Sequence, residues 1–149
     1  MATTVTAADL TVSISETYSL NGATYGNTIN KVFSSNGEVI QRIMSIAISS
    51  FTDIFHTSTV DGLGTIVKND WTYFRITNLD DTNYITLRLY DDTDSQFFKV
   101  EAGESFMLMS PDIDVDTEGT TFNSFADVAE IAAEANTAAV DVEVIMVTT

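Results

Sequence analysis

The feature that most constrains the fold of this chain is a repeated alternation of apolar and polar residues with a period of two. Successive side chains of a β-strand point to opposite faces, so this period indicates strands with one face in a core. Five segments follow the pattern, namely residues 10–15, 44–49, 73–77, 84–90 and 140–147. Repeated this often, the pattern predicts an all-β chain rather than a parallel α/β sheet.

Short polar segments between these strands have the chemistry of turns. Asn36-Gly37 is a hairpin signal, because a type I′ turn needs a positive φ at both central positions. Residues 78–83 indicate a longer hairpin loop, and residues 91–95 separate two further strands. This spacing predicts a single antiparallel β-sandwich, jelly-roll-like, with about eight strands. We expect residues 1–9 to form a flexible N-terminal arm and residues 10–149 to form one sandwich domain.

Residues 126–135 leave two predictions open. Phe125, Val128, Ala129 and Ala132 fall at helical spacing, and the Ala and Glu residues around them favour a helix. The alternative is a strand over residues 130–135 that leads into the last alternating segment. At most one short helix is therefore expected, in the C-terminal third of the chain.

The composition excludes several classes of partner. The 149 residues include 22 Asp+Glu and 6 Lys+Arg, which give a formal net charge of -16. Nucleic acids and anionic membranes demand a basic surface, so neither is an expected partner. The absence of cysteine excludes disulfides and thiolate chemistry. We identify neither a secretory signal nor an apolar run near the roughly 18 residues that span a bilayer.

One acidic segment is a candidate metal site. Asp112, Asp114, Asp116 and Glu118 would project to one face of an extended segment, and hard oxygen ligands of this kind suit calcium. The segment departs from the EF-hand loop, because Thr117 stands where that loop needs glycine. The alternative is a solvated acidic loop that discourages strand-to-strand aggregation. We expect no cofactor.

No motif indicates catalysis. His56 is the single histidine, and Asp53, three residues earlier, is expected on the opposite face of its strand, so a Ser-His-Asp triad is not predicted. The segment Gly62-Leu63-Gly64-Thr65 resembles part of a phosphate loop, but no Gly-Lys-Ser/Thr follows it. We interpret that segment as a flexible connection and expect that the chain is not an enzyme.

Aromatic and apolar residues on the second face of several strands predict a contact surface. Tyr73, Tyr84 and Tyr90 alternate with the apolar residues around them, and the last strand is apolar on both sides near its end. A subunit or partner contact explains this pattern, while carbohydrate binding and ordinary surface aromatics are the alternatives. The predicted contact residues are Trp71, Tyr73, Tyr84, Tyr90, Ile145 and Val147.

Residues 71–108 carry a series of structural motifs. A strand ends in Arg-Ile-Thr-Asn-Leu (75–79), an Asp/Thr/Asn turn follows (80–83), then an alternating strand (84–90) and a Val-x-Ala-Gly-Glu-x-Phe turn (100–106). In these motifs the chain resembles the small β-sandwich virion proteins of tailed bacteriophages. The resemblance covers the middle and last thirds of the chain, and residues 1–60 have no comparable match.

The resemblance implies a virion structural protein, foremost a capsid decoration or cement protein that stabilises the particle. A tail or fibre component of the same virion is one alternative, and a carbohydrate-binding β-sandwich module is a second. The implied partners are further copies of the chain, with a trimer favoured, and the major capsid protein or other virion proteins. The implied location is the virion, assembled in the host cytoplasm. Because copies with a charge of -16 repel one another, we expect salt to improve assembly or thermal stability.

Overall fold

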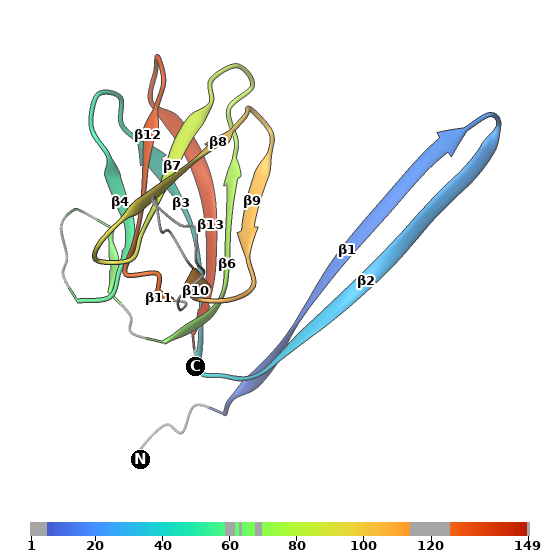
Figure 1. The fold of residues 1–149 in the computed structure, drawn as a ribbon, viewed down its shortest axis with the longest axis horizontal. Coiled ribbons are helices and arrows are strands. Elements are labelled where there is room, and N and C mark those ends of the chain that lie inside the picture. Colours follow the sequence, from blue (N-terminus) through green and yellow to red (C-terminus); the bar gives the residue numbers. More distant parts are fainter. Residues whose placement is uncertain (1–5, 59–61, 63, 68–69, 114–125, 149) are drawn as a thin grey trace, which may run out of the picture.

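The computed structural model of the chain describes residues 6–58, 62, 64–67, 70–113 and 126–148 (Figure 1). Within these ranges the regular secondary structure is β-strand, which confirms the all-β prediction. The strands are β1 (Ala8–Leu20), β2 (Ala23–Asn36), β3 (Glu38–Ile46), β4 (Thr52–His56), β5 (Ile66–Val67), β6 (Trp71–Asn78), β7 (Ile85–Tyr90), β8 (Ser95–Val100), β9 (Ser105–Leu108), β10 (Asp112–Ile113), β11 (Ala126–Asp127), β12 (Glu130–Ala135) and β13 (Val140–Thr148).

Two packed sheets form the body of the molecule. One has the strand order β3-β13-β6-β9, and the other has the order β5-β4-β12-β7-β8. Apart from β5, which runs parallel to β4, the neighbouring strands are antiparallel. Eight strands form the antiparallel pairs of the body: β3 pairs with β13, β4 with β12, β6 with β9 and β7 with β8. In chain order, the first of these eight strands thus pairs with the last, and each later pair lies inside the one before it. This nested pairing defines a jelly roll, so the predicted jelly-roll-like sandwich is confirmed.

The core lies between the two sheets and is built from the inward-facing residues of the alternating strands. In β7, Ile85, Leu87 and Leu89 are buried while the residues between them are partly exposed. Trp71 lies in the same core, where its ring packs edge-on against Phe55 and Phe74 at centroid distances of 6.0 and 6.4 Å. The period-two pattern therefore identified the inward faces of these strands.

The described part of residues 126–135 is extended rather than helical. β12 lies between β4 and β7, and five of its six residues are buried. Small alanine side chains allow this strand to be covered on both faces. Hydrogen bonding to two neighbouring strands then outweighs the local helix preference of Ala and Glu. Of the two open predictions, the strand is the one that the fold adopts.

Two predicted hairpin turns are instead connections between different sheets. Asn36-Gly37 joins β2, which pairs with β1, to β3, which pairs with β13. Residues 78–83 likewise lead from β6 in one sheet to β7 in the other. In that connection the backbone N–H groups of Asn83 and Thr82 donate to the Asp80 carboxylate and lower its pKa. Both predictions were wrong for one reason. Turn residues indicate that the chain reverses, but they do not show that the two strands joined by the turn pair with each other.

The first two strands form a separate sheet that projects from the body as a long ribbon (Figure 1). The strands pair from Ala8 opposite Asn36 to Leu20 opposite Ala23. Asn21 and Gly22 have φ of 52° and 81°, so this Asn-Gly pair makes the tight reversal that positive φ permits. The predicted boundary after residue 9 therefore differs from the structure. The ribbon occupies residues 8–36, and the packed sheets begin with β3; residues 1–5 lie outside the described ranges.

Candidate functional site

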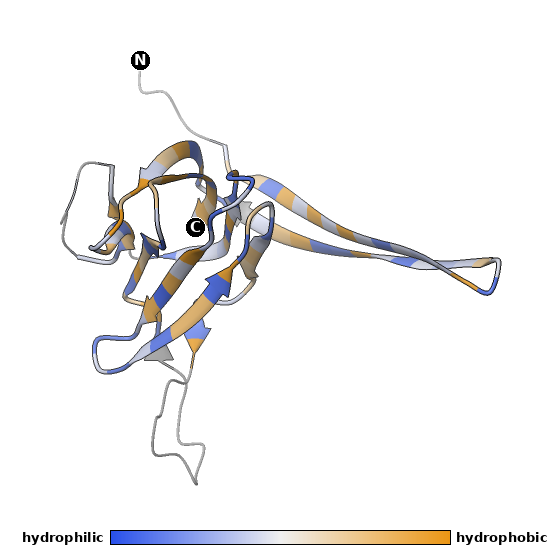
Figure 2. Cartoon of the chain, turned by 90° about the horizontal axis from the view of Figure 1, so that it is seen from above, coloured by the Kyte–Doolittle hydropathy of each residue, from blue (hydrophilic) through white to orange (hydrophobic). Residues whose placement is uncertain are grey.

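The ribbon has one apolar and one polar face. Directly opposite residues of paired strands share a face, so the register of β1 and β2 assigns both faces. On the polar face, Ser13 donates to Asn30 at 2.7 Å and Thr28 donates to Ser15 at 3.1 Å. Figure 2 shows hydrophobic residues recurring along both strands. The apolar face consists of Leu10 and Phe33, Val12 and Lys31, Ile14 and Ile29, Glu16 and Asn27, Tyr18 and Tyr25, and Leu20 and Ala23.

The base of this apolar face is covered by the body of the same chain. Phe33 is buried in a cluster with Tyr73 and Val147, and the Phe33 and Tyr73 rings lie 5.8 Å apart. Leu10 and Val12 of the ribbon pack against the same cluster. Tyr73 and Val147 are opposite one another in the register of β6 and β13, on the side of the four-stranded sheet that faces away from the core. The ribbon is thus anchored on the outside of that sheet.

Beyond its base, the apolar face is open to solvent. Tyr18, Leu20, Tyr25 and Ile29 have side chains between 48% and 61% exposed. The two tyrosines stack on each other at 5.3 Å with an interplanar angle of 18°. We call residues 14–20 and 23–29 of this face the free face. An isolated two-stranded ribbon is only marginally stable in water, and a contiguous exposed apolar surface marks a contact site.

A second exposed apolar area lies on the outer face of the four-stranded sheet. Val39 is opposite Val147 in the sheet register, and Ile43 is opposite Glu143. Ile43 is 66% exposed, the most of any large apolar side chain in the described residues. Met107 lies on the same face, where its sulfur accepts a hydrogen bond from the Tyr73 hydroxyl at 3.7 Å. We call Val39, Ile43 and Met107 the outer patch.

The charged groups beside the outer patch neutralise one another. Arg75 Nη2 lies 2.5 Å from Glu143 Oε2, and Gln41 donates to Glu143 Oε1 at 2.9 Å. The hydrogen bond from Gln41, followed by the bond from Arg75 and its positive charge, lowers the pKa of Glu143. A paired carboxylate of this kind leaves the outer face less repulsive toward an apolar partner than an unpaired one would.

The six predicted contact residues lie in three places. Tyr73 and Val147 are buried where the ribbon meets the outer face, with Ile145 partly buried beside them. Trp71 belongs to the core between the sheets. Tyr84 and Tyr90 are partly exposed at the five-stranded sheet, where Lys99 Nζ lies 4.2 Å above the Tyr84 ring.

The free face was not among the contact surfaces predicted from the sequence. The signal that could have found it is Asn21-Gly22, which stands between two alternating segments of nearly equal length. That arrangement is the ordinary signature of a long hairpin, and it would have placed Tyr18 beside Tyr25. The exposure of the ribbon, however, is a tertiary property that no local pattern contains.

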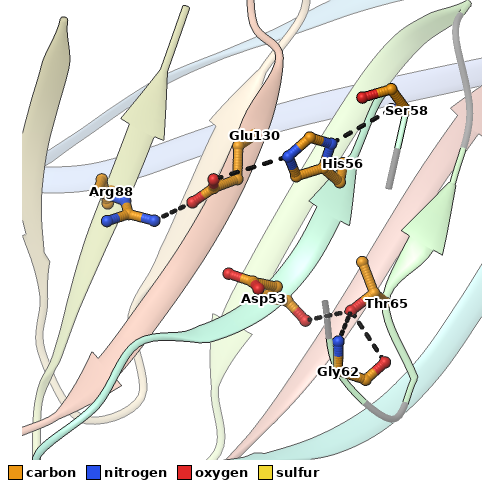
Figure 3. A network of polar contacts seen from close by, with 7 residues as sticks. All are labelled: Asp53, His56, Ser58, Gly62, Thr65, Arg88 and Glu130. Atoms are coloured by element: carbon orange, nitrogen blue, oxygen red, sulfur yellow. Dashed lines mark hydrogen bonds and ion pairs between the residues drawn. The ribbon is translucent and has the colours of Figure 1, made fainter. Parts of the chain in front are cut away.

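A polar network crosses the five-stranded sheet on the side away from the core (Figure 3). The buried Glu130 accepts a hydrogen bond from Arg88, and its other oxygen lies 3.9 Å from His56 Nε2. The Ser58 backbone N–H donates to His56 Nδ1 at 3.2 Å. In a catalytic triad Nδ1 faces the acid and Nε2 serves the nucleophile, which is the reverse of this arrangement. The network links β4, β12 and β7 and has the geometry of a structural tie.

The position of Asp53 corrects one prediction. A register shift in the pairing of β4 with β12 lets Ile54 and Phe55 both enter the core. Because of this bulge, Asp53 and His56 face the same side of the strand, not opposite sides. The Asp53 carbonyl accepts a hydrogen bond from the Thr65 hydroxyl at 3.4 Å (Figure 3). Alternation with a strict period of two cannot anticipate a bulge.

Most of the candidate calcium site cannot be placed, because Asp114, Asp116 and Glu118 lie outside the described residues. Asp112 pairs with Asp127 across β10 and β11. A hydrogen bond between their carboxyl groups, followed by desolvation and the charges of Asp112 and Asp70, raises the pKa of Asp127. Among the residues that the structure describes, no group of three or more acidic or histidine side chains is arranged to hold a metal ion.

Comparison of the chain with protein-family models, curated proteins and solved structures finds no match. The resemblance to phage virion proteins therefore stays a prediction that rests on residues 71–108. In the ranges that the structure covers, no helix has the length and apolar character needed to cross a bilayer.

Proposed function

We propose that this chain is a structural protein of a bacteriophage virion, a decoration or cement protein that binds copies of itself and the capsid. The phage assignment rests on the motifs of residues 71–108. The observation that carries the assembly role is the free face of the ribbon, where four large apolar or aromatic side chains are about half exposed or more. Such a face gains stability only when another surface covers it.

The fold alone does not select this function. Jelly rolls occur in capsid proteins, lectins and cupins, so the function has to be argued from the surfaces that this one presents. Here a packed sandwich carries a ribbon of 13 and 14 residues per strand that reaches well away from it (Figure 1). A projecting arm anchored at one end is suited to join subunits of a shell.

The charge distribution also supports an assembly role for the ribbon. Residues 8–36 contain two acidic residues, Asp9 and Glu16, and one lysine, Lys31, so they carry a net charge of -1 out of -16. The remaining residues carry -15 and repel the same region of another copy. The nearly neutral ribbon is therefore the part of the chain that can approach an acidic neighbour with the least repulsion.

The direct test is binding to undecorated capsids of the phage that encodes the chain. Wild-type protein is incubated with such capsids, which are then sedimented, and the bound fraction is measured. We expect saturable binding, a more heat-stable particle, and loss of binding in a Tyr25→Ser, Ile29→Ser variant. The matched control, Thr24→Ala, Thr28→Ala, changes the polar face of the same strand and should bind normally. Wild-type protein that stays in the supernatant at all concentrations would contradict the cement role.

One observation favours the carbohydrate-binding alternative. The rings of Phe51 and Phe97 lie 6.1 Å apart on the five-stranded sheet, Phe97 is largely exposed, and the Arg88 guanidinium lies 4.6 Å above the Phe51 ring. An aromatic pair with a nearby donor can stack on a sugar ring. A glycan-binding screen tests this alternative. Hits that Phe97→Ala abolishes would support it, and a screen without hits would remove it.

A further inference from the structure

We propose that the free face of the ribbon packs on the outer patch of a second copy of this chain. In a closed assembly each copy then donates one ribbon and accepts one. This inference rests on the proposed assembly role and deepens it, because it names both the partner and the surface on which the ribbon docks.

The chain itself shows which kind of surface the apolar face of the ribbon fits. At its base, that face packs through Phe33 on Tyr73 and Val147, which belong to the outer face of the four-stranded sheet. The outer patch, which lies on the same face, is left open. The two surfaces are therefore chemically matched within one chain. The outer patch lies on the two edge strands, Val39 and Ile43 on β3 and Met107 on β9, of the sheet whose central strands carry Tyr73 and Val147.

A cavity marks the junction between the two surfaces. It has a volume of about 140 Å³ and lies between the ribbon base and the start of β3, where Leu10, Asn36 and Val39 contribute to its lining. Val39 is also the member of the outer patch nearest to the ribbon in sequence. An apolar segment docked on the outer patch beside Val39 would therefore also contact the apolar lining of this cavity.

Charge favours a ribbon as the occupant of the outer patch. Docking of one sandwich on another would bring two regions of charge -15 together, whereas the ribbon adds only -1. The carboxylate nearest the centre of the acceptor face, Glu143, is already paired with Arg75 at 2.5 Å. The acceptor face therefore presents apolar side chains beside a neutralised ion pair, and Glu16 is the single charged side chain on the free face that would dock there.

The estimated contact area favours an assembly in which each copy both donates a ribbon and accepts one. Residues 14–20 extend over about 23 Å at roughly 3.3 Å per residue, and two strands side by side are about 10 Å wide. One docked ribbon would thus bury about 250 Å² on each side, or about 500 Å² in total, which is below the roughly 1,000 Å² of a specific interface. When two copies exchange ribbons reciprocally, both contacts belong to one interface, which then buries about 1,000 Å² and reaches that range.

Cross-linking between chains tests the contact directly, because the chain contains no cysteine of its own. Two full-length variants, Ile29→Cys on the free face and Ile43→Cys in the outer patch, are made with different mass tags, mixed and oxidised. We expect a mixed disulfide at a yield at least tenfold above the control. The control pairs Ile43→Cys with Thr28→Cys, which is exposed on the polar face of the ribbon. Both ribbon variants differ from wild type at one exposed position, so their folding should be equally unaffected.

Native mass measurement of the wild-type protein completes the test. A closed oligomer together with the 29–43 disulfide supports the inference. A monomer at all concentrations overturns it, as does an oligomer in which Ile29→Cys cross-links only to itself, because the ribbons would then pair with each other. Capsid binding without the 29–43 contact would overturn this inference and leave the proposed function standing. The 29–43 contact without capsid binding would support this inference and contradict the proposed cement function.

Discussion

The body and the ribbon of this molecule share the same alternating pattern, but their apolar side chains differ in burial. Leu87 in β7 is fully buried, whereas Ile29 in β2 is 61% exposed, although each alternates with polar neighbours. In the body, two sheets turn their apolar faces toward each other. In the ribbon, two strands form one layer whose apolar face meets a second layer only at its base. Alternation therefore identifies an apolar face without identifying what covers that face.

The energetic consequence of this difference is large. Full burial of an aliphatic side chain contributes about 1.5–3 kcal/mol relative to its exposed state. The residues of the jelly-roll core contribute this stability within one chain. The corresponding residues of the free face contribute it only in contact with another molecule. The free energy of unfolding of the monomer should therefore depend strongly on the body and weakly on the outer part of the ribbon.

The most demanding test makes the same substitution in both regions. Ile76→Ala removes a fully buried side chain and should lower the free energy of unfolding by about 2–5 kcal/mol, because it leaves a cavity in the core. Ile29→Ala, its matched control in the free face, should change this free energy by less than about 0.5 kcal/mol. Urea denaturation of dilute protein measures both. Equal losses would mean that the ribbon is covered in the monomer.

A substitution at the junction between the two regions should destabilise the ribbon and leave the sandwich unchanged. Phe33→Ala removes the ring that anchors the ribbon on Tyr73 and should weaken the ribbon by about 1–3 kcal/mol. Hydrogen exchange should then show lost amide protection in residues 8–36, with protection retained in β7 and β12. Val32→Ala, an exposed neighbour on the polar face, serves as the control and should leave the ribbon protected. Loss of protection throughout the sandwich would show that the two regions unfold as one unit.

Salt should act mainly on the body, because that region carries -15 of the -16 net charge. Raising the ionic strength from about 0.01 M to 0.15 M shortens the Debye length from about 30 Å to about 8 Å and weakens the self-repulsion. We expect the melting temperature of the sandwich to rise by a few degrees, since about 1 kcal/mol corresponds to roughly 2–4 °C in a chain of this size. A melting temperature that is flat or falls over this range would contradict the expectation.

The smallest effect concerns pH and the outer face. The pKa of Glu143 is lowered from the ordinary value of 4.5 in the folded chain, so its interactions with Gln41 and Arg75 stabilise the fold above pH 4.5. That stabilisation is lost as the pH falls through the lowered pKa. Glu143→Gln should therefore be less stable than wild type at neutral pH, and the difference between the two melting temperatures should shrink as the pH falls through the lowered pKa of Glu143. A difference that does not depend on pH would show that the charge of Glu143 contributes nothing.

Much of the fold could be predicted because strands and turns depend on local chemistry. The alternation of residues 84–90 and 140–147 identified the inward faces of β7 and β13, and residues 91–95 do close a hairpin between β7 and β8. Residues 126–135 could not be decided, since the local helix preference of Ala and Glu opposes a pairing that only the neighbouring strands supply. The bulge at Ile54 and Phe55 was invisible for a similar reason.

The candidate site was predicted only in part. Tyr73, Ile145 and Val147 were recognised as apolar residues on the second face of their strands, and the structure brings them together. What covers Tyr73 and Val147 is Phe33 of the same chain, which no pattern around those residues indicates. The free face and the outer patch depend on where the ribbon leaves the body, which is a property of the assembled fold.

Two Asn-Gly pairs in this protein have the same local sequence signal but different structural outcomes. The amino-acid pattern alone indicates that the chain alternates, that it reverses at polar turns, and that its net charge is -16. Asn21-Gly22 closes the ribbon, yet Asn36-Gly37 sends the chain into a different sheet, where the Gly37 N–H donates to the Thr148 carbonyl at 2.9 Å. The folded arrangement selects between these outcomes, because the result depends on which distant strand is available to pair and on which apolar face remains to be covered.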